Sequence, residues 1–108
     1  MKVAITSQGR HMASEVDPRL GRAKCLLVVD TDSGEFTAHD NGSNLDAVQG
    51  AGVQAAQDVI DLGVDAVITG NAGPKAAAAL ATASVKVHKR NRGTVREAIE
   101  QFKSGRPQ

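Results

Sequence analysis

Five short runs of aliphatic and β-branched residues constrain the fold of this chain more than any other feature of its sequence. Each run has the length and composition of a β-strand, and we place them at 2–7, 24–30, 35–40, 65–69 and 85–87. Stretches with helical patterning follow the third, fourth and fifth runs, at 53–62, 75–83 and from 95 onwards. This order predicts an α/β fold: a hairpin followed by right-handed crossover units, which form a mixed sheet with helices on both faces.

Helix boundaries are marked by local signals. Pro74 suits a first helical turn, and Leu62-Gly63 ends the preceding helix. Thr94 and Glu97 have the spacing of a capping box. There are no internal repeats and no low-complexity linker, so we expect a single domain over 1–104 and a tail at 105–108.

The predicted topology brings several loops together. If the second strand runs antiparallel to its neighbours, the carboxyl ends of the other four strands share one edge of the sheet. The crevice between the first and fourth strands is then a topological switch point, the usual ligand position in open α/β sheets. Four loops converge there, together with the start of the second strand at Ala23: 8–22, 41–52, 70–74 and 88–93.

The stretch Asp-Pro-Arg-Leu-Gly-Arg-Ala at 17–23 has the most distinctive composition among these loops. Asp17-Pro18 favours a turn, and Gly21 permits an unusual backbone conformation or a close approach. Arg19 and Arg22 offer planar forks of donors suited to an anion.

The converging loops are rich in cations and glycines. Predicted helix N-termini at Gly52 and Pro74 point to the same edge and favour an anion. We therefore predict a site for a small anionic ligand; the alternative is that the glycines only shape turns and the basic residues are only solvated. Its candidate residues are Arg10, His11, Met12, Arg19, Gly21, Arg22, Asn41, Gly50, Gly52, Asn71, Gly73, Lys75, His88 and Lys89.

Composition narrows the function. Aromatic residues make up 2% of the chain, which argues against nucleic-acid modules that stack bases on rings. No apolar run approaches the length of a membrane span and the N-terminus lacks a signal-peptide pattern, so we expect a cytoplasmic protein with no membrane or nucleic-acid partner. Residues 71–108 carry eight Lys or Arg against two Glu, whereas 1–70 carry five basic and ten acidic residues. This asymmetry indicates a local basic site rather than a surface for a long polyanion.

Four side chains are candidates for metal chemistry. The imidazole and thioether of His11-Met12 suit a soft metal, although such a pair is common in ordinary loops. Cys25, the only cysteine, lies inside an apolar strand, where we expect a buried and inert thiol. His88 stands at the start of the last basic loop, where it can contact an anion or a metal.

An ordered set of short motifs resembles the dinitrogenase iron–molybdenum cofactor family, which includes NifX-like and NifB C-terminal-like domains. The motifs are Lys-Val-Ala-Ile at 2–5, the heptapeptide at 17–23, Asn41, Gly-Ala-Gly-Val-Gln-Ala-Ala at 50–56, Gly-Val-Asp-Ala-Val-Ile-Thr-Gly at 63–70 and Gly73-Pro74. No single motif is specific, but their order covers nearly the whole chain.

The resemblance implies an RNase H-like three-layer fold with strand order 3-2-1-4-5. It also implies non-catalytic binding or carriage of a metal–sulfur cluster containing molybdenum, of the Mo–Cu or Fe–Mo sulfide type, with no nucleotide cofactor. The expected partners are cluster-assembly or acceptor proteins. The short chain looks closest to small stand-alone members such as the orange protein. No motif fixes the ligand residues, so the site residues named above rest mainly on their position at the sheet edge.

The basic sheet edge and the predicted fold suggest two other functions. A regulatory or interaction module that binds a phosphate-bearing small molecule or a partner protein fits the same basic edge. A nuclease, which the fold alone suggests, needs carboxylates near the centre of the first strand and the end of the fourth. The first strand has none, and Asp65 stands at the wrong end of its strand.

Overall fold

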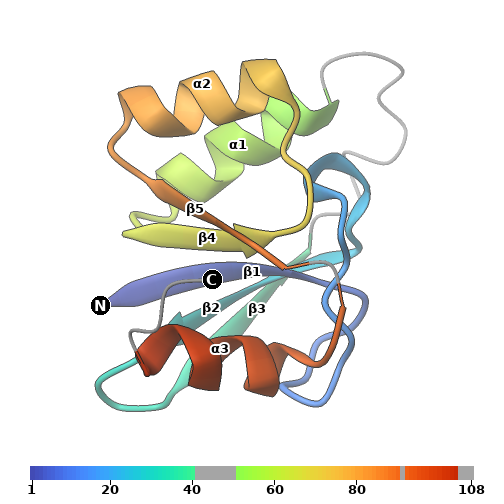
Figure 1. Cartoon of the computed structure of the whole chain (residues 1–108), viewed down its shortest axis with the longest axis vertical. Helices are drawn as coiled ribbons and strands as arrows, with labels where there is room; N and C mark the ends of the chain where they lie inside the picture. Colours follow the sequence, from blue (N-terminus) through green and yellow to red (C-terminus); the bar gives the residue numbers. More distant parts are fainter. Residues whose placement is uncertain (41–50, 91, 105–108) are drawn as a thin grey trace.

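The computed structural model describes residues 1–40, 51–90 and 92–104. These residues form five strands, three α-helices and one 3₁₀ turn (Figure 1). In order they are β1 (Lys2–Ser7), η1 (Leu20–Arg22), β2 (Cys25–Asp30), β3 (Phe36–Asp40), α1 (Ala51–Asp61), β4 (Ala66–Thr69), α2 (Pro74–Thr82), β5 (Lys86–Lys89) and α3 (Val95–Lys103).

The five strands form one mixed sheet in the order β3-β2-β1-β4-β5. β2 is antiparallel to both of its neighbours, whereas β4 runs parallel to β1 and β5 runs parallel to β4. Helices α1 and α2 cover one face of the sheet and α3 covers the other (Figure 1). The predicted fold class, the strand order and the three layers are therefore confirmed.

Each face of the sheet has its own apolar core, because successive strand residues point to opposite faces. On the α1/α2 face, Ala4 and Val67 pack with Val59 of α1 and Leu80 of α2. On the α3 face, the strands contribute a second set that packs against α3: Val3, Ile5, Leu27, Val29, Ala66 and Ile68 with Val95, Ala98 and Ile99. A sheet buried on both faces explains why β1 and β4 have near-continuous apolar sequences.

The last strand differs from the prediction. It spans Lys86–Lys89 rather than 85–87, so the prediction that His88 and Lys89 belong to a loop is wrong. The reason is tertiary pairing: the amide of Lys86 donates to the carbonyl of Asp65, and the amide of Arg90 donates to that of Thr69. This parallel ladder extends a polar, basic segment that has little strand signal of its own.

Helix α1 begins at Ala51, two residues earlier than predicted, so Gly52 lies in its first turn rather than in a preceding loop. Residues 41–50, which the sequence predicts to be irregular, lie outside the described residues. No described helix is both long enough and apolar enough to cross a membrane.

The start of α3 fixes the position of the long loop after β1. Thr94 and Glu97 form the predicted capping box, in which the Thr94 hydroxyl accepts from the Glu97 amide and the Glu97 carboxylate accepts from the Thr94 amide. The amide of Val95 donates to the Ser14 carbonyl at 2.9 Å, and the amide of Val16 donates to the Gly93 carbonyl at 2.8 Å. The predicted cap is confirmed, and it also anchors the segment that leads to the sheet edge.

The capping box makes stability depend on pH. Donation from the Thr94 backbone amide, and then from its hydroxyl, lowers the pKa of Glu97 below its ordinary value of 4.5. A carboxyl with a lowered folded pKa stabilises the fold above that ordinary value, and this contribution is lost as the pH falls through the folded pKa. We expect the advantage of the wild type over Glu97→Gln in urea unfolding to be full at neutral pH and to shrink in acid below 4.5.

The matched control is Glu100→Gln, which removes an exposed glutamate of the same helix that takes no part in the capping box. A difference between wild type and Glu97→Gln that stays constant from pH 7 to pH 3, or grows in acid, would contradict this account.

Candidate functional site

The strand register brings the loops to one edge as predicted. Ser7 at the end of β1 pairs with Cys25 at the start of β2, and Cys25 pairs with Asp40 at the end of β3. Thr69 at the end of β4 pairs with Lys89 at the end of β5. The carboxyl ends of β1, β3, β4 and β5 therefore lie together, and the following segments start from the same edge.

Two buried threonines occupy the switch point between β1 and β4. Thr6 and Thr69 are both fully buried, and their hydroxyl oxygens lie 2.9 Å apart. Thr6 Oγ1 also donates to the Asp17 carbonyl at 2.6 Å, and the amide of Asp17 donates to the Thr6 carbonyl at 2.9 Å. The long loop is thus attached directly across the ends of the two central strands.

The Asp17–Leu20 segment closes this crevice. Asp17 is 4% exposed, and its Oδ1 accepts from the Arg19 amide at 2.9 Å, which is an Asx turn around Pro18. Leu20 is fully buried, and its amide donates to the Asn71 carbonyl at 3.2 Å. The backbone and buried side chains of this segment therefore have a structural role, in keeping with the turn predicted at Asp17-Pro18.

The side chain of Arg19 is the exposed part of this segment. It is 66% exposed, and its Nε lies 3.5 Å from Asp17 Oδ1. Its backbone forms a parallel bridge with Asn71, which places it next to the turn before α2. Arg19 therefore remains available to an anion at this edge, with part of its charge offset by Asp17.

Gly21 does not have an unusual backbone conformation, whereas its predicted contribution to binding stays a prediction. It lies within the 3₁₀ turn η1, whose right-handed backbone is open to any residue, so no unusual conformation is required. Arg22 ends this turn, and its side chain lies outside the described part of the structure, as do Asn41 and Gly50. The predicted contributions of Arg22, Asn41 and Gly50 stay predictions.

The long loop crosses from one side of the sheet to the other. Val16 belongs to the α3-face core, whereas Leu20 belongs to the α1/α2-face core. In Figure 1 the loop runs from beside α3 to beside α1 over this short distance in sequence. The predicted site residues are consequently divided into two groups, one on each side.

The α3 side holds four of the predicted residues. Arg10 donates to the Ala38 carbonyl at 3.4 Å, and His11 is exposed beside it in sequence. Met12 packs against the α3-face core, and its carbonyl accepts from the Arg96 amide. His88 places its ring edge-on to Phe102, with the ring centroids 4.8 Å apart.

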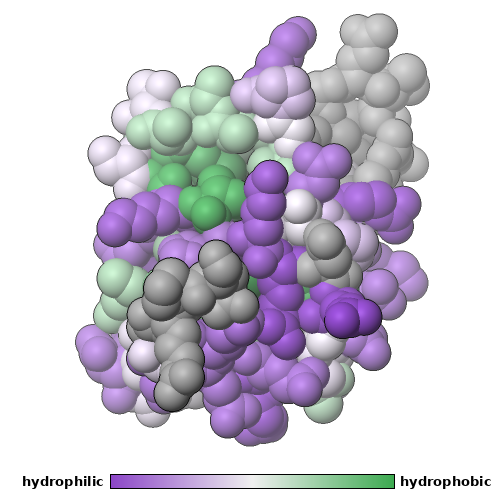
Figure 2. All heavy atoms as spheres, in the orientation of Figure 1, coloured by the Kyte–Doolittle hydropathy of each residue, from purple (hydrophilic) through white to green (hydrophobic). Residues whose placement is uncertain are grey.

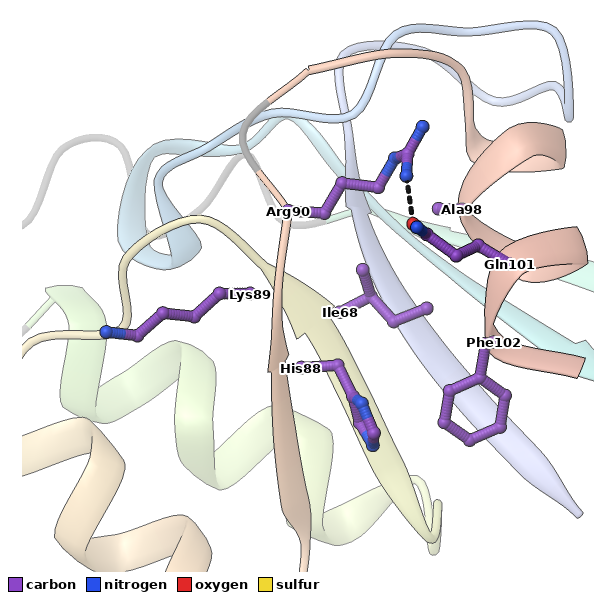
Figure 3. A pocket seen from close by; sticks show the side chains of 7 residues that line it. All are labelled: Ile68, His88, Lys89, Arg90, Ala98, Gln101 and Phe102. Atoms are coloured by element: carbon purple, nitrogen blue, oxygen red, sulfur yellow. Dashed lines mark hydrogen bonds between the residues drawn. The ribbon is translucent and has the colours of Figure 1, made fainter. Parts of the chain in front are cut away.

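A small cavity lies beside His88, between β5 and α3 (Figure 3). The guanidinium of Arg90 donates to the Gln101 side chain there, and its Nε is buried without a hydrogen-bond partner among the described residues. The cavity has a volume of about 40 Å³, which suits a water molecule rather than a metal cluster.

The α1/α2 side holds the other described candidates around the start of α2. Asn71 Oδ1 accepts from the Gly73 amide at 3.0 Å, and Gly73 takes a φ of 78°, which favours glycine. Lys75 is exposed in the first helical turn. Lys89 is exposed on the same face as Thr69 and Val87, and Figure 3 shows its side chain pointing away from the cavity beside His88.

The first turns of α1 and α2 also favour an anion on this side. Neither contains an acidic residue, and no side chain caps α2. Pro74 has no amide hydrogen and the Ala77 amide donates to Gly73, so the amides of Lys75 and Ala76 are the ones without an intrahelical acceptor. These amides and the nearby cations provide donors for an anionic ligand.

The described residues give no cluster of three His, Cys, Asp or Glu side chains able to hold a metal ion. Cys25 is 6% exposed within β2. Asp65 precedes β4, and its Oδ2 accepts from the Lys2 amide at the opposite edge of the sheet. Asp65 therefore stands where the sequence places it, away from the edge where a nuclease site is expected.

Comparison with known proteins identifies the family. The family model described as "Dinitrogenase iron-molybdenum cofactor" matches residues 1–105. The chain belongs to this family. The apo orange protein from Desulfovibrio gigas superposes with a TM-score of 0.92 at 39% sequence identity, over 96% of this chain and 88% of the other.

Two other proteins are similar to this chain over almost its whole length. A putative NifB protein from Thermotoga gives a TM-score of 0.83 at 36% identity, over 97% of this chain and 89% of the other. An uncharacterised protein of Methanocaldococcus jannaschii is 27% identical over an alignment 108 residues long, which covers 98% of this chain and 88% of that protein. The predicted family resemblance is confirmed.

Sequence reasoning missed the Thr6–Thr69 pair. A signal was available, because each threonine directly follows the apolar run of a central strand. Strand periodicity and parallel pairing place both on one face. The sequence does not reveal that the Asp17 carbonyl bonds to this pair as a third partner.

The Asx turn gives a test of how the crevice is closed. We expect Asp17→Ala to lower the free energy of unfolding by about 1–3 kcal/mol, because it leaves the Arg19 amide without its acceptor in a partly buried turn. Asp17→Asn keeps an oxygen at that position and is expected to lose less than half as much. The measurement is urea unfolding followed by circular dichroism, and equal losses in the two variants would contradict the assigned role of the hydrogen bond.

Proposed function

We propose that this protein binds and carries an anionic metal–sulfur cluster on the α1/α2 side of the carboxyl edge, without catalysing a reaction on it. Membership of a family described by the iron–molybdenum cofactor of dinitrogenase supports a cluster-related role. The resemblance to small stand-alone members extends the proposal to a molybdenum-containing sulfide of the Mo–Cu or Fe–Mo type.

One observation carries the proposal: cations and unpaired backbone donors gather on a single side of the sheet edge. Arg19, Lys75 and Lys89 supply exposed positive charges, and the first turn of α2 supplies amides without an acceptor. The buried carboxylate of Asp17 is the nearest opposing charge along the segment, and it is engaged by the Arg19 amide. A compact anion is therefore favoured over a cation at this surface.

The sulfur chemistry of the chain is consistent with such a cargo. Cys25 is the only cysteine and is buried, so the protein offers no set of thiolates of the kind that holds iron–sulfur clusters. A cluster that brings its own sulfide ligands needs no protein thiolate. Its sulfides instead accept charge-assisted hydrogen bonds from guanidinium, ammonium and amide groups.

We propose the described residues of the α1/α2 side as the main contacts: Arg19, Gly52, Asn71, Gly73, Lys75 and Lys89. We propose a second, separate set of residues on or near the α3 side for contact with a metal or a partner protein: Arg10, His11, Met12 and His88. Cluster-assembly or acceptor proteins are the partners that a carrier requires.

The test is a titration of apo-protein with tetrathiomolybdate and copper(I), followed by visible absorption. We expect new charge-transfer bands that saturate with cluster, and weaker binding at high salt because exposed charges are screened. Arg19→Ala and Lys89→Ala should each weaken binding about fivefold, which corresponds to about 1 kcal/mol. Lys103→Ala, which removes an exposed cation at the far end of α3, is the matched control.

Absence of new bands, or equal binding by all variants, would reject the proposal. A thermal-shift comparison of thiometallates with nucleotides and inorganic phosphate distinguishes cluster binding from the alternative function, the binding of a phosphate-bearing molecule. If phosphate compounds stabilise the protein and thiometallates do not, the chain is a phosphate-binding regulatory module instead.

A further inference from the structure

Strand β5 forms an open edge of the sheet (Figure 1). The amides of Lys86 and Arg90 donate to the carbonyls of Asp65 and Thr69. The even-numbered residues of β5 therefore direct their backbone groups toward β4. Because alternate strand residues point these groups to opposite sides, Val87 and Lys89 direct theirs outward. No described residue bonds to those outward groups, and they are available to a further strand.

An apolar groove runs beside this edge on the α2 side. Its lining is mainly apolar, from Ala77 and Ala81 of α2 together with Val85 and Val87, and it also includes Ser84, Lys86 and His88. Both alanines are exposed, and Figure 2 shows apolar surface gathered over α2 and beside β5. A strand added to β5 would place every second side chain in this groove, where there is room for small apolar residues.

The other face of β5 is basic. Lys86 and His88 are exposed on the face opposite to Val87, and Arg90 follows in the same alternation. The groove lining contains no acidic side chain. Two carboxylates of neighbouring segments are engaged elsewhere, since Glu97 bonds to Thr94 and Asp65 bonds to the Lys2 amide.

We propose that the edge of β5 binds an extended acidic segment of a partner protein as a sixth strand. Backbone bonds to Val87 and Lys89 hold the segment, small apolar side chains occupy the α2–β5 groove, and acidic side chains on the other face meet Lys86 and His88. The recognised sequence therefore alternates small apolar and acidic residues. This proposal does not depend on the cluster-binding function.

Charge selects this occupant over a second copy of the chain. An antiparallel pair of β5 strands would bring lysines of one copy near lysines of the other, because β5 begins with Lys86 and ends with Lys89. Like charges on opposing strands are destabilising, and lysines on an edge commonly prevent such self-pairing. The same lysines attract an acidic strand, which is a recognised mode of peptide binding.

The experiment uses the full 108-residue chain and a fluorescent peptide of alternating Glu and Val, with a Lys/Val peptide as the charge-reversed control. We expect saturable binding of the Glu/Val peptide by fluorescence anisotropy, weakened by salt, and no binding of the Lys/Val peptide. Amide hydrogen exchange should show new protection at Val87 and Lys89.

Three variants locate the peptide. Val87→Pro removes an outward amide while leaving the ladder to β4 intact, and Ala81→Glu blocks the groove with a negative side chain; each should weaken binding about tenfold. Lys86→Glu should do the same, whereas Lys24→Glu, an equal change of charge near the start of β2, should not. Thermal unfolding by circular dichroism verifies that each variant is folded.

A Glu/Val peptide methylated on alternate amides tests the backbone bonds with wild-type protein, whatever the stability of Val87→Pro. We expect the methylated peptide to bind about tenfold more weakly. Equal binding of the acidic and basic peptides, full binding of the methylated peptide, or protection of β5 through dimerisation in the absence of peptide would each overturn the proposal.

Discussion

The hydrogen bonds that join Thr6, Thr69 and Asp17 hold the carboxyl edge of this sheet together. They bring two central strands and the long loop into contact inside a fully buried site, where unpaired hydroxyls and carbonyls would be costly. Because these groups satisfy one another, the switch point is closed by the protein itself. In the described part of this edge, the polar groups available to a ligand are therefore the side chains and helix ends around the crevice.

This arrangement explains the character of the candidate site. Among the described residues of this edge, the donors available are exposed cations and the amides of a first helical turn. Such a surface favours a compact anion held by several charge-assisted hydrogen bonds. It also fits a protein with a single, buried cysteine, which offers no set of thiolate ligands.

Much of the fold could be predicted from the sequence, because its strands are buried on both faces and their apolar runs are unmistakable. The extent of β5 could not, since Lys86–Lys89 is a strand only through its pairing with β4. The sequence also did not predict that the candidate site residues are divided between the two sides of the sheet. That division depends on Val16 joining one core and Leu20 the other, and local sequence does not say to which face a loop residue turns.

The loop after β1 has one further consequence, for variation in chain length. Gln8 and Glu15 are joined by a backbone hydrogen bond, so the turn between them is closed at its base before the chain reaches Val16. Lengthening that turn adds only a loop-closure entropy that changes slowly with length, as long as the Met12 and Ser14 carbonyls keep their bonds to the start of α3. Evolution can vary the size of this excursion on the α3 side while the Asp17–Leu20 closure and the cations on the other side keep their positions.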